Sequence, residues 1–183
     1  MSFTFPKAGP KKPGYAPEQV EEFLTRARNQ FNNPVDSGVT AYDVHNTEFD
    51  LVHGGFIPEI VDGAMDKLED SFASREILRQ KNEKGSYALD DRFSRVLELI
   101  RGRLERPRGK RFSNTGLLLR GYSRKQVDAL CEHITRHFDS QAPISLVEVR
   151  RVVFNAKRGG YVEAQVDAFI DRVIEALQIE QNR

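Results

Sequence analysis

The sequence predicts a mainly α-helical protein, and three observations lead to this fold class. Apolar residues recur at intervals of three and four residues in four segments, as one face of an amphipathic helix requires. Each of these segments follows a glycine and an aromatic residue, and three of them begin with a residue suited to a helix start. A fifth apolar stripe lies between the second and third segments. We also expect small extended pieces just before each glycine.

The four segments are copies of one motif: a glycine, an aromatic residue, four further residues, a valine and an acid. A phenylalanine precedes the aromatic residue by ten positions in the first and third copies and by seven in the second and fourth. Long and short copies therefore alternate. The motif residues are Gly14, Tyr15 and Val20; Phe49, Gly55, Phe56 and Val61; Gly121, Tyr122 and Val127; and Phe154, Gly160, Tyr161 and Val166.

Matched spacings indicate a tandem duplication. One constant shift in numbering relates the two short copies, taking Phe49 to Phe154 and also Val44 to Val149. A second constant shift relates the two long copies and takes Gly14 to Gly121. We predict a first half over 1–90 and a second half over 112–183, joined by a helix and basic connection over 91–111. The expected copies are long-type 3–33, short-type 39–84, long-type 112–140 and short-type 143–180.

Local residues predict where the helices begin. Pro17 and Pro58 suit a first helical position, and Ser123 suits an N-cap. An extra helical turn is expected before each short copy's phenylalanine. Ser145 and Glu148 form the stronger capping-box pattern there, and Thr40 with Asp43 a weaker version.

The fifth stripe, between Phe93 and Leu104, predicts a helix that Pro107 stops. The glycine before each aromatic residue is expected either to adopt a positive φ or to let two chain segments pass closely. No single amphipathic helix can bury its own stripe, so the four repeated helices must pack on each other or on a partner.

Composition excludes several classes. The chain has 183 residues with 39% hydrophobic residues, 12 Phe and 5 Tyr, which argues against wholesale disorder. A single cysteine gives no disulfide framework, and we expect a cytoplasmic protein without a signal peptide or membrane span. The net charge of +1 gives no overall reason to expect nucleic acid as a partner.

That net charge hides an asymmetry. Residues 1–91 hold 10 Lys and Arg against 16 Asp and Glu, whereas residues 92–183 hold 18 against 11. The basic excess is concentrated in one run, which is either a solvated linker or a contact for anionic lipid, an acidic partner or nucleic acid. The run comprises Arg101, Arg103, Arg106, Arg108, Lys110 and Arg111.

At its motif residues the chain resembles the DivIVA/GpsB family of bacterial cell-division and polar-growth scaffolds. The most similar stretch is the second copy, from Asp43 through Phe49 to Gly55-Phe56 and Val61-Asp62. The fourth copy resembles the family less fully, and the first and third keep only the glycine-aromatic turn and the following helix. The resemblance implies a non-catalytic cytoplasmic scaffold, without cofactor, that binds protein partners and the inner membrane surface.

In that family an apolar residue and an arginine at the loop tip contact the membrane. In this chain only the third copy carries the combination, in Leu117, Leu118, Leu119 and Arg120. Two interpretations stay open for this cluster: a loop buried against the helices, and an apolar wedge at a bilayer surface.

The resemblance also implies a dimer through a parallel coiled coil, but no heptad pattern is sustained here. Four motifs in one chain instead predict that the copies pair internally and imitate the family's dimer within one chain.

No residue pattern predicts catalysis. His133 and His137 stand four apart, which could place two ligands on one metal, but a histidine pair without a metal is the stronger interpretation. Cys131 falls on an apolar stripe and is expected to be a core residue rather than a nucleophile. We therefore expect no enzyme activity, no metal and no cofactor.

The sequence favours a DivIVA-type adaptor in bacterial growth or division, located at a cell pole or septum. Its partners would be other division or polar-growth proteins and an anionic membrane surface. The first alternative is a purely protein-binding module without membrane contact. The second is a nucleic-acid-associated protein that uses the basic run over 101–111.

Overall fold

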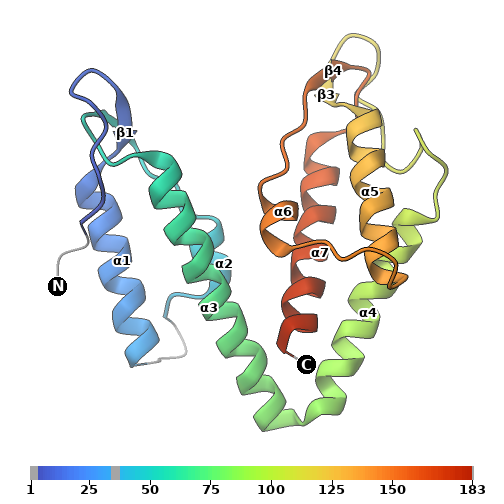
Figure 1. Ribbon diagram of the computed structural model, residues 1–183, viewed down its shortest axis with the longest axis horizontal. Coiled ribbons are helices and arrows are strands. Elements are labelled where there is room, and N and C mark those ends of the chain that lie inside the picture. The colour runs from blue at the N-terminus through green and yellow to red at the C-terminus, as the bar shows by residue number, and fades with distance from the viewer. Residues whose placement is uncertain (1–3, 34–37, 183) are drawn as a thin grey trace. The chain divides into compact units, whose positions relative to one another are not determined.

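The computed structural model describes residues 4–33 and 38–182, and it is mainly helical with two small antiparallel sheets (Figure 1). The predicted fold class is confirmed at this level. The chain divides into two compact units, unit 1 over residues 1–76 and unit 2 over residues 77–183. Residue 3, where the first long copy was expected to begin, lies outside the described residues.

Unit 1 contains the first two copies of the motif. Its elements are strand β1 (Pro13–Tyr15), helix α1 (Pro17–Asn32), helix α2 (Ala41–His45), strand β2 (Leu51–His53) and the first part of helix α3 (Pro58–Lys84). Pro17 and Pro58 begin their helices as expected. Strands β1 and β2 form the sheet, which lies at one end of the unit (Figure 1).

Helices α1 and α3 of unit 1 run in the same direction from the sheet. Tyr15, just before α1, bridges to Phe56, just before α3. Near the far end of α1, the ring of Phe31 lies 5.5 Å from that of Phe72 on α3. Both pairs have the same separation in sequence, as two parallel helices in register require. The buried residues of α1 and α3 form one core together with Val44 of α2. This core includes Val20, Phe23, Leu24, Ala27, Val61, Met65 and Phe72.

Unit 2 contains the third and fourth copies together with a further helix. Its elements are helix α4 (Ser86–Leu104), strand β3 (Arg120–Tyr122), helix α5 (Arg124–Phe138), helix α6 (Leu146–Arg150), strand β4 (Ala156–Arg158) and helix α7 (Glu163–Asn182). The predicted helix ending before Pro107 is present as α4, which begins earlier than expected.

The boundary between the units lies between Glu76 and Ile77, whereas the repeat pattern placed it near residue 90. The reason is packing. Ile77 and Leu89 join the core of unit 2, and α4 packs against α7 and α5. Helix α7 accordingly buries residues on several sides: Val166, Phe169, Val173, Ile174, Ala176, Leu177, Gln178 and Ile179.

The two sheets have matching registers. In unit 1 Pro13 pairs with His53 and Tyr15 with Leu51, and in unit 2 Arg120 pairs with Arg158 and Tyr122 with Ala156. The first strands of the two sheets are related by the numbering shift of the long copies, and the second strands by that of the short copies. Each sheet therefore pairs the strand that holds one Gly-Tyr pair with a strand just before the next glycine-aromatic pair of the chain.

The glycine before each aromatic residue lets two backbones pass closely, which is the second of the two roles expected for it. A Cβ added to Gly121 would lie 2.1 Å from the carbonyl oxygen of Tyr161, and one added to Gly160 would lie 2.4 Å from that of Gly121. Gly14 and Gly55 approach each other in the same way in unit 1. The positive φ falls one residue earlier in the short copies, at Gly54 (70°) and Gly159 (61°).

The more complete helix cap is on α2, whereas the sequence predicted it on α6. Thr40 and Asp43, the weaker pattern, form a complete capping box, which lowers the pKa of the Asp43 carboxyl. The hydroxyl of Ser145 accepts the Glu148 N–H, but the Glu148 carboxylate lies 3.1 Å from His133 on α5. The Glu148 carboxylate thus contacts His133 of another helix rather than the Ser145 N–H that a capping box would give it.

Candidate functional site

The two most exposed apolar side chains of the described residues lie in the loop before β3. We define the leucine loop as residues 116–119. Leu117, Leu118 and Leu119 are 89%, 92% and 65% exposed. The loop is thus not buried against the helices, and one of the two interpretations left open by the sequence is excluded.

Local hydrogen bonds fix the base of the leucine loop. Gly116 takes a φ of 82°, which favours glycine, and turns the chain. The Thr115 hydroxyl donates to the Leu119 carbonyl at 3.0 Å, and the Gly159 N–H donates to the same carbonyl at 3.1 Å. Because this carbonyl is held from both sides, the leucines project from a defined base.

Positive charge beside the leucine loop comes from both strands of the sheet. Arg120 and Arg158 lie directly opposite each other in the register, and Lys157 precedes Arg158. All three are exposed, and the described structure shows no acidic partner for any of them. Like charges placed opposite each other in a sheet repel, so the arrangement favours a bound anion. We call the leucine loop with these three cations tip 2.

The basic run over 101–111 is divided between surface and interior. Arg103 donates to the Arg111 carbonyl and lies over the Phe112 ring, and Arg108 pairs with Glu132 at 2.5 Å. Arg111 is buried. Arg101, Arg106 and Lys110 are exposed and show no ion-pair partner within the described residues, whereas Arg108 is exposed but paired. Three of the six cations therefore serve the fold of unit 2, which leaves fewer charges for an external anion than the sequence indicated.

Arg111 belongs to a buried polar network. Its guanidinium lies 3.2 Å from the Asp128 carboxylate and also donates to the Leu104 and Asp128 carbonyls. The Tyr161 hydroxyl donates to the same carboxylate at 3.0 Å, and the Gly109 N–H at 2.8 Å. Burial raises the pKa of Tyr161 to about 12. The network joins the basic run, α5 and the fourth copy's aromatic residue.

The histidine pair on α5 is not arranged around a common point. His133 lies 3.1 Å from Glu148, whereas His137 lies 2.9 Å from Glu180 and accepts the Ile144 N–H. Across the described residues, no three His, Cys, Asp or Glu side chains are placed to hold a metal ion. Each histidine connects α5 to a different element.

Cys131 is fully buried, and burial raises the pKa of its thiol to about 12. We expect Ellman's reagent at pH 8 to label the folded protein about a thousandfold more slowly than a free thiol, because the thiolate is the reacting form. Labelling in urea should reach one thiol per chain. Rapid labelling without denaturant would contradict this burial.

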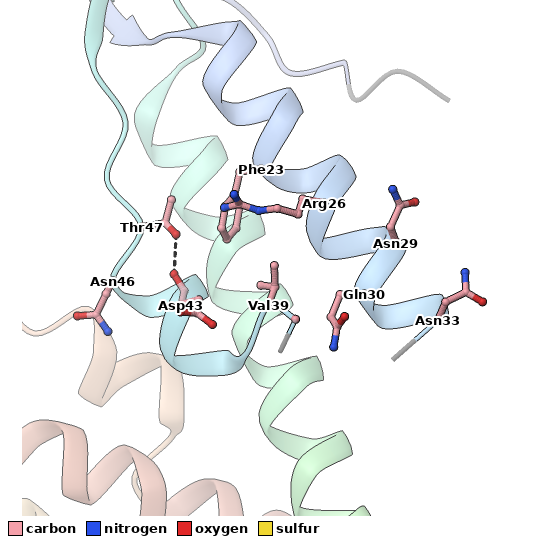
Figure 2. A pocket seen from close by; sticks show the side chains of 10 residues that line it. Phe23, Arg26, Asn29, Gln30, Asn33, Val39, Asp43, Asn46 and Thr47 are labelled. Atoms are coloured by element: carbon pink, nitrogen blue, oxygen red, sulfur yellow. Dashed lines mark hydrogen bonds between the residues drawn. The ribbon is translucent and has the colours of Figure 1, made fainter. Parts of the chain in front are cut away.

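Unit 1 has an open pocket between α1 and α2, with both polar and apolar lining (Figure 2). The Arg26 side chain lies over the Phe23 ring there, and the Thr47 hydroxyl donates to the Asp43 carbonyl. Two of its lining residues, Asn33 and Gly38, flank residues 34–37 in the sequence, and those four lie outside the described residues. It is lined by Phe23, Arg26, Asn29, Gln30, Asn33, Gly38, Val39, Asp43, Asn46 and Thr47.

The sequence identified the leucines and Arg120 of tip 2 but not Lys157 and Arg158. Lys157 and Arg158 are distant from the leucines along the chain and reach them only through the pairing of β3 with β4. The available signal was that Lys157 and Arg158 come just before Gly159 and Gly160, as Arg120 comes just before Gly121.

Within residues 4–33 and 38–182, no helix has both the length and the apolar character needed to cross a membrane. Comparison with known proteins identifies no relative: no family model, no curated protein and no solved structure matches this chain.

Proposed function

We propose that this protein is a non-catalytic scaffold of the DivIVA type that contacts an anionic membrane surface through tip 2 and recruits protein partners in bacterial growth or division. The observation that carries the proposal is the exposure of three consecutive leucines beside three cations without acidic partners among the described residues. Its place of action is the cytoplasmic face of the membrane, at a pole or septum.

The energetics of tip 2 suit reversible membrane contact. Burial of apolar side chains in lipid contributes up to about 0.8 kcal/mol per CH₂ group. Each cation close to an anionic surface adds about 1 kcal/mol. Leucines without cations would not select anionic lipid, and cations without leucines would bind weakly at physiological salt. Tip 2 has both kinds of residue.

We also propose that the chain imitates a dimer of single-motif proteins, and matched aromatic contacts within the two units support this. In unit 1 the Tyr15 ring packs on Phe49 of the other copy and its hydroxyl bonds to Asp62. In unit 2 Tyr122 does the same with Phe154 and Asp167. Tandem duplication of a two-motif unit, with pairing inside the chain, accounts for these matched contacts.

Replacing a leucine of tip 2 by a charged residue tests the membrane contact. In flotation with vesicles of phosphatidylglycerol and phosphatidylcholine, Leu118→Asp should weaken binding at least about tenfold, since it removes apolar burial and adds repulsion. Leu99→Asp is the matched control, because Leu99 is also exposed (66%) but lies on α4. Equal flotation of Leu118→Asp and the unaltered protein would overturn the proposal.

Charge asymmetry favours a second candidate function, a purely protein-binding module. Unit 1 carries 7 Lys and Arg against 13 Asp and Glu, and unit 2 carries 21 against 14, so the units could dock partners of opposite charge. Such a module would not float with vesicles of any composition. Nucleic-acid binding is less supported, because half of the basic run is engaged within unit 2.

A fluorescent fusion in the native bacterium tests the role in growth or division. Fluorescence at the poles or septum is the expected result. Diffuse fluorescence in the cytoplasm would contradict it.

A further inference from the structure

We propose that this protein associates with further copies of itself, because unit 1 of one chain binds unit 2 of the next through surfaces of opposite charge. The inference goes beyond the proposed function, since it needs neither lipid nor tip 2. We call the two surfaces the acidic face, which comprises Glu18, Glu22, Glu48 and Asp50, and the basic face, which comprises Arg124, Lys125, Arg151 and Val153.

A glutamine on the first long helix of each unit holds the segment that leads into the second strand. In unit 1 the Gln19 side chain accepts the Asp50 N–H at 2.8 Å and donates to the Asp50 carboxylate at 2.7 Å. In unit 2 the Gln126 side chain accepts the Asn155 N–H at 2.8 Å. The numbering shift of the long copies relates the two glutamines, and that of the short copies relates their partners. Both units therefore bring the same two segments together.

In unit 1 these two segments present acidic side chains. Glu18 and Glu22 lie one helical turn apart on α1, and Glu48 comes two residues before the residue that the glutamine holds. All three are exposed, and the described residues show no ion-pair partner for them. The cation one turn further along α1, Arg26, lies over the Phe23 ring instead. Like charges one turn apart destabilise a helix, so a cationic partner would offset the repulsion.

In unit 2 the matched positions have reversed or lost this charge. Lys125 stands where unit 1 has Glu18, and Val153 stands where it has Glu48. Val153 is 85% exposed, although it is apolar. Arg124 and Lys125 are also exposed, without an ion-pair partner in the described part of the chain. The face that is acidic in unit 1 is thus basic in unit 2, with an apolar side chain beside the cations.

The cations of the basic face lie where a helix does not favour them. Arg124 and Lys125 form the first turn of α5, and the positive end of the helix dipole repels cations there. Helix α1 instead has Glu18 in its first turn, which the dipole stabilises. An acidic protein surface beside Arg124 and Lys125 would offset the repulsion in α5.

Charge complementarity identifies the partner as a second copy of the chain. Residues 45–53 contain two acids and no Lys or Arg, whereas the matched residues 150–158 contain four Lys or Arg and no acid. Every molecule carries both faces, so a second copy always supplies the opposite charge. Contact between two different faces is heterologous and can add chain after chain. Exposed ion pairs are individually weak, so we expect association that is reversible and sensitive to salt.

Sedimentation velocity of the full chain without lipid tests the association. At about 0.05 M salt the mean sedimentation coefficient should rise with protein concentration, and at about 0.5 M salt it should stay that of a monomer, because salt screens exposed charges. A monomer at every concentration in low salt would overturn the proposal. Pairing of the two faces within one chain would also give that result.

Neutral variants test which surfaces meet. The acidic-face variant carries Glu18→Gln, Glu22→Gln and Glu48→Gln, and the basic-face variant carries Arg124→Gln and Lys125→Gln. Each variant alone should associate at least about tenfold more weakly than the unaltered protein, because one face has lost its charge. An equal mixture should form one-to-one pairs, since each variant supplies the face that the other lacks.

Arg101→Gln with Arg136→Gln is the matched control, because it removes two exposed cations of unit 2 that lie outside the basic face. This control should associate like the unaltered protein. If either face variant alone associates as strongly as the unaltered protein, that face is not the contact. If the mixture stays monomeric, the two faces do not bind each other. These measurements contain no lipid, so their failure would leave the vesicle test of tip 2 unaffected.

Discussion

Gly121→Ala is expected to destabilise unit 2 by about 4 kcal/mol or more, a large effect for the addition of one methyl group. The added Cβ would lie 2.1 Å from the Tyr161 carbonyl oxygen, a separation that no pair of such atoms tolerates. Side chains cannot yield here, because the obstacle is backbone. That backbone is fixed by paired hydrogen bonds between Tyr122 and Tyr161, at 3.0 and 2.9 Å.

Gly102→Ala is the matched control for this substitution. Gly102 lies inside α4, and nothing within 4 Å would meet its Cβ. Alanine favours a helix by up to about 1 kcal/mol over glycine, so this variant should be slightly more stable. The urea dependence of Cys131 labelling would report the stability of unit 2 in both variants. Similar midpoints for Gly121→Ala and the unaltered protein would show that the crossing is not tightly packed.

The helices could be predicted from the sequence because their causes are local. A proline at a first helical position, an N-cap and an apolar stripe lie within one segment, and α1, α3, α5 and α7 follow their copies of the motif. For the glycine before each aromatic residue, the sequence left two roles open: a positive φ, or a close passage of two chain segments. Choosing between them needs the partner strand, which belongs to the other copy of the motif in the same unit.

The domain boundary and the buried cations could not be predicted, because both depend on distant contacts. Leu89 belongs to the core of unit 2 through the packing of α4, which no residue near position 90 specifies. Arg111 resembles its neighbours in the basic run, and only Asp128 and Tyr161 distinguish it. The charge of the basic run, counted from the sequence, includes Arg111 although its side chain is buried and cannot reach an external anion.

The proposed membrane-contacting site was predictable only where its residues are contiguous in the sequence. Three leucines followed by an arginine in a loop before a glycine-aromatic pair form a contiguous pattern. The cations of β4 are brought beside the leucines by pairing between strands, so they emerge only from the register of the sheet.

Asp128→Ala is expected to destabilise unit 2 by about 3–5 kcal/mol, because it leaves the buried Arg111 guanidinium without its counter-charge. Tyr161→Phe should cost only about 2 kcal/mol, since it removes a neutral hydroxyl that donates to Asp128 and accepts the Arg111 backbone N–H. The difference follows from the charge left behind rather than from the number of hydrogen bonds lost. Glu21→Ala is the matched control. Glu21 follows the motif valine of α1 as Asp128 follows that of α5, but unit 1 has Phe56, which carries no hydroxyl, at the position of Tyr161.

Alkaline pH gives an independent measure of the same network. Burial raises the Tyr161 pKa to about 12, above its ordinary value of 10.0, so the folded chain keeps a proton that the unfolded chain releases. The stability of unit 2 should therefore fall between pH 10 and 12, and Tyr161→Phe should lose less stability over that range. Urea titrations at several pH values would show both trends. If Asp128→Ala were as stable as Glu21→Ala, Arg111 would have to reach solvent, and it would then join the exposed cations of the basic run.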